Sequence, residues 1–417
     1  MRNMANEQNA KKIGAVMVVG AGVAGMQASL DLAESGYYVH LVDKSPTIGG
    51  IMAQLDKTFP TNDCAMCIIS PKLVEVGRHL NINILPNTEV ESVEGEAGNF
   101  KVTLQCQPRY IDLEACTACG QCRLVCPATA VNEFNQKLDV REATYMRYPQ
   151  AIPRGFMIDR AVCIGCGLCE KVCLAEAVHY DDTVRKTEIE VGAVVLAPGN
   201  EVFDPSQFDT YNYLGFPNVV TSLEFERILS ASGPYRGHLM RPYDREEPAK
   251  IAWLQCVGSR NINACDNSYC SAVCCMYAIK EAVIAKEHAH GDLDTAIFYM
   301  DMRTYGKEFE QYYNRAQQHG HEVEPARRDG VEVLRDESPQ DDIDGDPGKE
   351  RHHAREAPAY EVELPEDDGE DAPAFHDVPI SLIVSGSRAT WMKSSSRFSL
   401  PYSEGRVFGS PSSRIFP

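Results

Sequence analysis

The chain has 417 residues, 44 % of them hydrophobic, and a formal net charge of −20. The length and the ordinary hydrophobic content predict a globular protein of two to three domains. The negative charge argues against a nucleic-acid partner, because binding to phosphates needs a basic surface. No run reaches the ~20 apolar residues of a membrane span, and residues 1–12 contain no signal-peptide segment. We therefore expect a cytoplasmic protein with no direct membrane insertion.

The cysteine content is high, with sixteen cysteines in the chain. In a reducing compartment such cysteines are expected to be metal ligands or redox thiols, not structural disulfides. Most of them lie in three tight groups or in the pair Cys64 and Cys67. This clustering indicates ligand sets for metal centres.

The first predicted elements are a buried strand, a glycine turn, a helix and a second strand, over residues 15–43. The turn has the order G-x-G-x-x-G and is formed by Gly20, Gly22 and Gly25. Such glycines allow a tight turn and let the backbone approach a pyrophosphate at the N-terminus of the helix. Asp43, at the end of the second strand, would accept a ribose hydroxyl. The pattern predicts dinucleotide binding; the alternative is a glycine-rich turn that has lost its ligand.

Two further features favour FAD over NAD. Just after the acid, and after Lys44, come Gly49 and Gly50, where FAD enzymes of the glutathione-reductase type often carry a glycine pair. A later strand in residues 192–200 resembles the strand by which that class returns to its FAD domain, with proline in place of threonine. The FAD domain is therefore expected to be interrupted and then resumed. The predicted FAD-binding residues are Gly20, Gly22, Gly25, Asp43, Lys44, Gly49, Gly50, Ala197, Pro198 and Gly199.

The interruption contains two cysteine motifs, at residues 116–127 and 163–173, each with the spacing C-x2-C-x2-C-x3-C. This spacing is typical of two-cluster ferredoxins, in which each motif gives three thiolates to one 4Fe–4S cluster and its fourth to the other. Zinc sites use paired C-x2-C units instead. The predicted ligand sets are Cys116, Cys119, Cys122 and Cys173 for one cluster, and Cys163, Cys166, Cys169 and Cys126 for the other. Between the motifs, residues 148–156 are expected to form an irregular surface loop.

After a linker with a strand and a helix capped by Ser222, the order strand, turn, helix, strand and helix returns from about Lys250. This order resembles the second dinucleotide domain of thioredoxin-reductase-like flavoproteins. Its turn is poor in glycine and rich in cysteine instead; the cysteines are Cys256, Cys270, Cys274 and Cys275. They predict a third 4Fe–4S cluster close to the flavin. The alternative is that these cysteines are buried and pack as small apolar groups. Cys265 is expected to be a spare, although it could compete as a ligand.

These motifs, with "FPTNDCAMCIISPKLVEVGRH" and "QCVGSRN…YCSAVCCMYAIKEA", resemble the A-type subunit of heterodisulfide reductase (HdrA) from anaerobic bacteria and archaea, from about residue 12 to 320. The resemblance implies an FAD-carrying, multi-cluster component of a CoB–CoM heterodisulfide reductase-like complex, with the third cluster bound by the four cysteines just named. It also implies flavin-based electron bifurcation. Electron pairs would come from a hydrogenase, formate dehydrogenase or NADH-oxidising partner. One electron would go to ferredoxin and the other to a disulfide reduced on the B and C subunits.

Other cysteines and histidines have weaker interpretations. Cys64 and Cys67 form a C-x-x-C pair that can be a redox dithiol, half of a metal site or inert. Cys106 lies on an expected strand and is interpreted as a packing residue. The histidines at residues 352–353 lie in an acidic stretch and are expected to be solvated.

The predicted fold is α/β, with two dinucleotide folds and an inserted α+β ferredoxin domain. The sequence from about residue 321 is acidic and then serine- and arginine-rich, without the family pattern, which predicts a shifted reading frame, a fragment or a disordered tail. The predicted domains are 12–108 and 184–247 for the FAD domain with its linker, 109–183 for the insert, 248–320 for the second Rossmann-like domain and 321–417 for the tail.

Two other functions remain open at this point. One is an NAD(P)H-oxidising iron–sulfur flavoprotein like the small subunit of glutamate synthase, which would need a glycine-rich second turn. The other is a non-catalytic electron wire with a vestigial flavin site.

Overall fold

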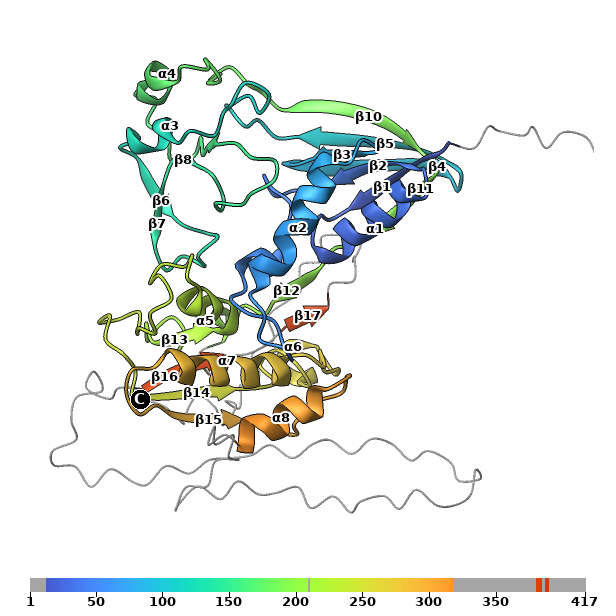
Figure 1. The fold of residues 1–417 in the computed structure, drawn as a ribbon. Helices are drawn as coiled ribbons and strands as arrows, with labels where there is room; N and C mark the ends of the chain where they lie inside the picture. Colours follow the sequence, from blue (N-terminus) through green and yellow to red (C-terminus); the bar gives the residue numbers. More distant parts are fainter. Residues whose placement is uncertain (1–12, 209–210, 319–379, 385–386, 390–417) are drawn as a thin grey trace, which may run out of the picture. The chain divides into compact units, whose positions relative to one another are not determined.

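The computed structural model describes four stretches of the chain, residues 13–208, 211–318, 380–384 and 387–389. They form two compact units, and Figure 1 labels most of their helices and strands. The first unit holds the described residues up to Glu201, Leu223–His238 and Ala389. The second holds Val202–Ser222 and the described residues from Leu239 to Arg388. No helix in these stretches is long and apolar enough to cross a membrane.

A four-stranded parallel sheet forms the centre of the first unit, in the order β11-β1-β2-β3. Its strands are β1 (Ala15–Val19), β2 (Tyr38–Val42), β3 (Ile82–Leu85) and β11 (Ala193–Leu196). β11 pairs with β1 in parallel although the whole insert lies between them in the chain. The predicted return strand therefore does complete the first Rossmann-like sheet.

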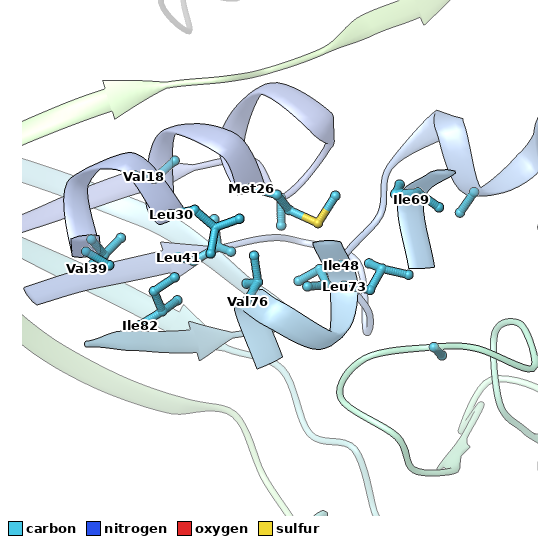
Figure 2. Packing of buried hydrophobic residues seen from close by; sticks show 14 of the residues in the cluster. Val18, Met26, Leu30, Val39, Leu41, Ile48, Ile69, Leu73, Val76 and Ile82 are labelled. Atoms are coloured by element: carbon cyan, nitrogen blue, oxygen red, sulfur yellow. The ribbon is translucent and has the colours of Figure 1, made fainter. Parts of the chain in front are cut away.

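Two helices, α1 (Val23–Glu34) and α2 (Ala65–Arg78), pack against this sheet with the 3-10 turn η1 (Ile51–Gln54). Figure 2 shows the apolar side chains of the helices meeting those of the strands. The labelled residues are Val18, Met26, Leu30, Val39, Leu41, Ile48, Ile69, Leu73, Val76 and Ile82. On each helix these positions are three or four residues apart, which places them on one side of the helix. Full burial of each such side chain stabilises the fold by about 1.5–3 kcal/mol.

An antiparallel sheet in the order β10-β5-β4 packs on the other side of β1. Its strands are β4 (Thr88–Glu96), β5 (Asn99–Cys106) and β10 (Arg185–Val191). Cys106 and Arg185 are paired in this sheet, so the insert leaves and re-enters the domain at adjacent points. Cys106 is half-buried at the end of β5. Since the ends of the insert are already joined, it needs no long linkers.

The insert is tied to the first sheet by a segment that the sequence predicts as a surface loop, residues 148–156. The segment is irregular, but the surface prediction is wrong, because Tyr148 and Ala151 are 4 % and 1 % exposed. Both pack with Phe134 into the core of α1 and α2. The hydroxyl of Tyr148 also donates to the carbonyl oxygen of Ile48. Apolar burial against the neighbouring domain therefore decides the position of a segment that has no periodicity of its own.

Arg109 forms a second connection between the insert and the first sheet. It is 7 % exposed, and its three donor nitrogens each bind a backbone carbonyl oxygen at 2.9 Å, those of Pro46, Gly155 and Phe156. Burial lowers the pKa of its guanidinium to about 10. A buried cation with such satisfied donors fixes the two parts in one arrangement.

Short elements make up the rest of the insert. They are α3 (Gln121–Leu124), α4 (Leu168–Val172), β6 (Thr129–Val131) paired with β7 (Val140–Glu142), and β8 (Thr144–Tyr145) paired with β9 (Met157–Ile158). α3 and α4 each begin after a glycine with positive φ, Gly120 at +82° and Gly167 at +73°. These turns are the places where the cysteine motifs enter their helices.

The second unit has a parallel sheet in the order β13-β16-β14-β15. Its elements are β13 (Val219–Thr221), β14 (Lys250–Leu254), β15 (Asp294–Phe298), β16 (Ile380–Val384), α6 (Ile262–Cys265), α7 (Cys274–His288) and α8 (Phe309–Gln318). The order of β14, α7, β15 and α8 confirms the predicted second Rossmann-like fold. The predicted linker helix is α5 (Ser222–Leu229), which belongs to the first unit except for Ser222. The turn η2 (Pro205–Gln207) and the strand pair β12 (Asn200–Val202) and β17 (Ser387–Ala389) are short additions.

β16 comes from the stretch that the sequence predicts as a tail outside the family pattern. It pairs in parallel with β13 on one side and β14 on the other. A short apolar run, "ISLIV", can occupy a central strand position because both of its backbone edges are then paired. The histidines at residues 352–353 and the other residues of 319–379 and 390–417 lie outside the described residues.

α7 is buried around most of its circumference and carries a buried carboxyl group. Glu281 is 0 % exposed, and its Oε2 accepts a hydrogen bond from Nε1 of Trp253 at 2.9 Å. Burial raises the pKa of Glu281 to about 8. The helix is thus the central packing element of the second unit.

Candidate functional site

The glycine turn after β1 has no room for side chains at two of its three glycines. Gly20 has a φ of +99°, and a Cβ there would lie 2.1 Å from the carbonyl oxygen of Ala197. A Cβ on Gly25 would lie 1.8 Å from the carbonyl oxygen of Gly20. These two glycines are required by the close packing of strand, turn and helix itself.

Gly22 differs, because a Cβ there would meet no protein atom within 4 Å. Gly22 is the N-cap residue of α1, so the backbone N–H groups of the first helical turn lie next to it. The glycine pair reaches this turn, since the N–H of Gly49 binds the carbonyl oxygen of Ala21 at 2.8 Å. A Cβ on Gly50 would lie 2.9 Å from Cα of Gly22. The open side of Gly22 is where a bound phosphate would approach the backbone.

The other predicted FAD residues lie at the same edge of the sheet. Asp43 follows β2, and its Oδ2 and Oδ1 accept the backbone N–H groups of Ala21 at 2.6 Å and Ser45 at 2.7 Å. Ala197 follows β11 and donates its N–H to Val19 at 2.8 Å. The neighbouring positions Lys44, Pro198 and Gly199 are exposed. The structure thus brings the predicted residues together at the carboxyl ends of three parallel strands, where nucleotides bind in such folds.

Cys64 and Cys67 lie at the start of α2. Cys64 is the N-cap residue, and its Sγ accepts the backbone N–H of Cys67 at 3.2 Å. Both cysteines are exposed. The pKa of the Cys67 thiol is raised, first by a side-chain hydrogen bond to Cys64. A side-chain hydrogen bond therefore links the two thiols.

One cavity in the insert is lined by cysteines from both motifs. The first three cysteines of the second motif, Cys163, Cys166 and Cys169, meet Cys126 of the other motif there. This is the crossed arrangement that the two-cluster ferredoxin pattern predicts. Four thiols around one cavity, with no histidine or carboxylate in its lining, fit a cubane cluster.

The other predicted ligand set lies partly in an apolar cluster of the insert. In this cluster Cys122 is buried, and Cys116 and Cys173 are partly buried; Cys119 is exposed. The N–H of Ala177 lies 3.4 Å from Sγ of Cys173. Burial raises the pKa of the Cys122 thiol to about 12, so a thiolate at this position needs a metal to hold its charge.

The second unit gathers four cysteines at the N-terminus of α7. The helix begins at Cys274 and Cys275, both 3 % exposed. The pKa of the Cys274 thiol is raised, first by a side-chain hydrogen bond to Cys275, and that of Cys275 is lowered by the same contact. Cys256 precedes this helix at a positive φ of +62° and interacts electrostatically with Cys274. Cys270 interacts in the same way with Cys275. These pairwise interactions link all four thiols near the start of α7. In the part of the chain that the structure describes, no three of them are already gathered around one metal position.

Cys265 differs from these four cysteines because its surroundings are apolar. It is 6 % exposed and packs in an apolar cluster with Phe203 and Val219. Gly258, in the turn, packs directly on the ring of Phe203, where a Cβ would lie 2.2 Å from a ring carbon. The turn that would hold a nicotinamide nucleotide is therefore filled by cysteines on one side and an aromatic ring on the other.

Charged groups that the sequence did not point to lie beside these cysteines. Asp301 accepts hydrogen bonds from Arg260 and, at 2.8 Å, from Nε of Arg303. Arg260 also forms a side-chain hydrogen bond to Cys256 that lowers the pKa of this thiol, although burial raises it overall. Arginines beside a thiolate group offset its negative charge. Only the tertiary structure places Asp301 and Arg303 here, because both lie outside the cysteine motif, whereas Arg260 follows Cys256 by four residues in the same turn.

The fold and these sites define a class: Rossmann-like proteins in which an iron–sulfur domain interrupts the first nucleotide-binding domain. Two protein-family models match this chain, and both agree with this class. The NAD(P)-binding Rossmann-like domain matches residues 18–69, and the 4Fe-4S binding domain matches residues 107–128.

Over 72 % of its length the chain is homologous to the A-type subunit of heterodisulfide reductase, which confirms the resemblance inferred from the motifs. It is 50 % identical over 301 residues to the second of the CoB–CoM heterodisulfide reductase iron–sulfur A subunits of Methanopyrus kandleri. It is 46 % identical over 302 residues to the A subunit of the H(2):CoB-CoM heterodisulfide,ferredoxin reductase of Methanothermobacter marburgensis. The chain spans about half the length of these relatives, 46 % of each.

Among solved structures, the chain is similar to the thioredoxin reductase of T. acidophilum, with a TM-score of 0.35 and 12 % identity, covering 72 % of this chain and 62 % of that one. It is also similar to the L-proline dehydrogenase of P. horikoshii, with a TM-score of 0.31 and 15 % identity, covering 71 % and 37 %. Likenesses at this level say nothing about function.

Proposed function

We propose that this chain is the FAD- and 4Fe–4S-containing electron-transfer part of a heterodisulfide reductase-like complex, and an oxidoreductase in that assembly. FAD would bind at the glycine turn, two clusters would lie in the insert and a third at the N-terminus of α7. FAD supplies the exchange between electron pairs and single electrons, and the clusters carry single electrons. The chain's own residues hold these groups and tune them.

One observation carries this proposal: the first unit contains both the glycine turn and a cavity lined by cysteines of the two motifs. Cys126 joins the cysteines of the second motif around one cavity, and the same insert is fastened to the first sheet through Tyr148 and Arg109. Electron transfer needs centres held at fixed separations, which a domain on a flexible linker would not provide. Buried anchors on the insert meet that need.

The partners belong to the proposal as well. We infer subunits of type B and C as the site of disulfide reduction. We also infer ferredoxin as one acceptor, and a hydrogenase, formate dehydrogenase or NADH-oxidising module as the donor. The names of the M. marburgensis and M. kandleri relatives support the disulfide and ferredoxin assignments. With this donor and these two acceptors, we also propose electron bifurcation at the flavin, in which one electron pair is divided between the path to ferredoxin and the path to the disulfide.

The test is anaerobic purification of the full chain followed by iron, sulfide, zinc and flavin analysis. About twelve iron atoms and one FAD per chain are expected, since each cubane holds four irons. About eight irons would mean that the cysteines of α7 are not ligands. Irons without flavin would leave an electron wire, and zinc in place of iron would contradict the proposal.

The pair Cys64 and Cys67 is proposed to be a redox dithiol with Cys64 as the attacking sulfur. The side-chain hydrogen bond between the two thiols and their exposure support this role. In the reaction the pair loses two electrons and two protons and closes as a disulfide, while an external disulfide becomes two thiols.

Anaerobic treatment of the protein with oxidised glutathione, followed by alkylation and peptide mass mapping, is expected to reveal a Cys64–Cys67 disulfide. Cys106, a single half-buried cysteine, serves as the control and should be alkylated. The variant Cys67→Ser should trap glutathione on Cys64, because the resolving thiol is missing. Independent alkylation of both cysteines after the treatment would contradict the role.

A further inference from the structure

The two cluster motifs of the insert belong to one internal repeat with an offset of 47 residues, seen in the step from Asp112 to Asp159. Oδ1 of each aspartate accepts the backbone N–H of the residue two positions later, at 2.9 and 3.1 Å. The backbone N–H groups of the two aspartates bind the carbonyl oxygens of Ala177 and Ala143 at 2.8 and 2.7 Å. The backbones of the two halves are therefore equivalent around these aspartates, although the first half also carries the β6–β7 hairpin. Side chains can be compared where the backbones correspond.

The backbone pairing identifies equivalent side chains that the spacing of the sequence does not. The pairs that define it are Ile111 with Val178 and Ile158 with Thr144. Val178 therefore corresponds to Thr144, and two residues further along the chain Tyr180 corresponds to Met146. Ile158 likewise corresponds to Ile111, so that two residues further along Arg160 corresponds to Leu113. One half thus has a phenol and a guanidinium where the other has two apolar side chains.

Both polar groups lie against the same thiol set. The hydroxyl oxygen of Tyr180 is 3.0 Å from Sγ of Cys169, and Nη1 of Arg160 is 3.6 Å from Sγ of Cys163. Tyr180 also lines the cavity that Cys126 shares with these cysteines. Because a ligating cysteine carries no proton, the hydroxyl would donate to Cys169 once a cluster is bound.

Backbone N–H groups lie at the sulfurs in both halves. The N–H groups of Ala118 and Gly165 each lie 3.4 Å from the sulfur of the first cysteine of their motif. In the first half, donors also come from the N–H of Ala177 at Cys173, from the backbone N–H of Gln121 and the hydroxyl of Thr117 at the exposed Cys119, and from the backbone N–H of Arg123 at Cys122. None of these groups brings a charge.

The first half also has a nearby cation, Arg109, which interacts electrostatically with Cys116. Its donor nitrogens bind three backbone carbonyl oxygens and none of them binds a sulfur. Among the described residues of the insert, the cation that donates to a sulfur of the two motifs is Arg160, at Cys163 in the second half.

We propose, on the basis of the proposed function, that Tyr180 and Arg160 set the reduction potential of the cluster held by the second thiol set and so make the two clusters of the insert inequivalent. Reduction adds one negative charge to a cluster. A hydrogen-bond donor or a cation beside its sulfurs stabilises that charge and raises the potential. Tyr180 and Arg160 are thus positioning and tuning residues, and they favour this cluster as the place where an electron rests.

The experiment is an anaerobic redox titration of the full chain followed by electron paramagnetic resonance, on wild type, Tyr180→Phe and Arg160→Leu. Phenylalanine keeps the ring of Tyr180, and Arg160 is exposed, so neither change empties the core. We expect the ratio of reduced to oxidised cluster in one of the insert's two transitions to fall about tenfold at a fixed potential, which is about 59 mV for one electron. Met146→Leu, the change at the equivalent site, should move neither transition.

Unchanged transitions in both variants at wild-type iron content would overturn the inference, and so would an equal shift of both transitions. Iron analysis separates this failure from that of the proposed function. A wild-type protein without clusters in the insert would defeat both, whereas a fully loaded protein with unresponsive potentials defeats only the tuning by Tyr180 and Arg160.

Discussion

Replacing Cys274 by serine is expected to remove about four of about twelve irons per chain and to leave the flavin content unchanged. Cys274 is buried at the first turn of α7 and in contact with Cys275. A hydroxyl is a poor ligand for the soft iron of a cubane, so the cluster should be lost as a unit. Iron and acid-labile sulfide assays on anaerobic protein measure this directly.

The matched control is Cys265→Ala, because Cys265 is equally buried but packs with Phe203 and Val219. This variant should keep all of its iron and lose about 1 kcal/mol of stability for the missing sulfur. Full iron in Cys274→Ser would mean that the cysteines of α7 only pack. Loss of iron in the Cys265 variant alone would transfer the ligand role to that residue.

Replacing Gly22 by alanine is expected to weaken FAD binding while leaving the stability of the flavin-free protein unchanged. A Cβ at Gly22 meets no protein atom within 4 Å, so a methyl group there disturbs only a phosphate that approaches the turn. A steric misfit of this kind costs about 1–3 kcal/mol, which is roughly a tenfold to hundredfold loss in affinity. Flavin content and FAD titration of the flavin-free protein would measure it.

Two controls separate ligand binding from folding in this experiment. Gly14→Ala, also without neighbours within 4 Å but outside the turn, should change neither flavin content nor stability. Gly25→Ala should destabilise the protein itself, because its Cβ would overlap the carbonyl oxygen of Gly20 at 1.8 Å. Normal FAD affinity in Gly22→Ala would argue against a nucleotide at this turn.

Local spacing carries much of the information about this protein. The steric demands at Gly20 and Gly25 act over a few residues, so the glycine pattern alone predicted the turn that the structure contains. The same holds for the cysteine motifs, whose ligand order depends on a tight loop and one helical turn. The second Rossmann-like fold followed from the order of its strands and helices.

Other features depend on partners far away in the chain. The stretch at residues 148–156 has no periodicity, and only burial of Tyr148 against the first sheet makes it an anchor. The strand Ile380–Val384 lies in a region of unfamiliar composition and is recognisable only through its pairing with β13 and β14. Contacts of this kind are invisible to a pattern that compares each residue only with its neighbours.

The sequence by itself therefore determined the glycine turn, the cysteine motifs and the order of the two nucleotide-binding folds, because each depends on short-range geometry. Only the tertiary structure decided which groups surround the thiols. Asp301 near Cys275 and Tyr180 at Cys169 lie close to them through the fold, not through any spacing in the motifs. Hydrogen bonds and charges around the sulfurs set the reduction potential of a cluster. The sequence therefore indicates the kind of centre, and the tertiary structure indicates which groups set its potential.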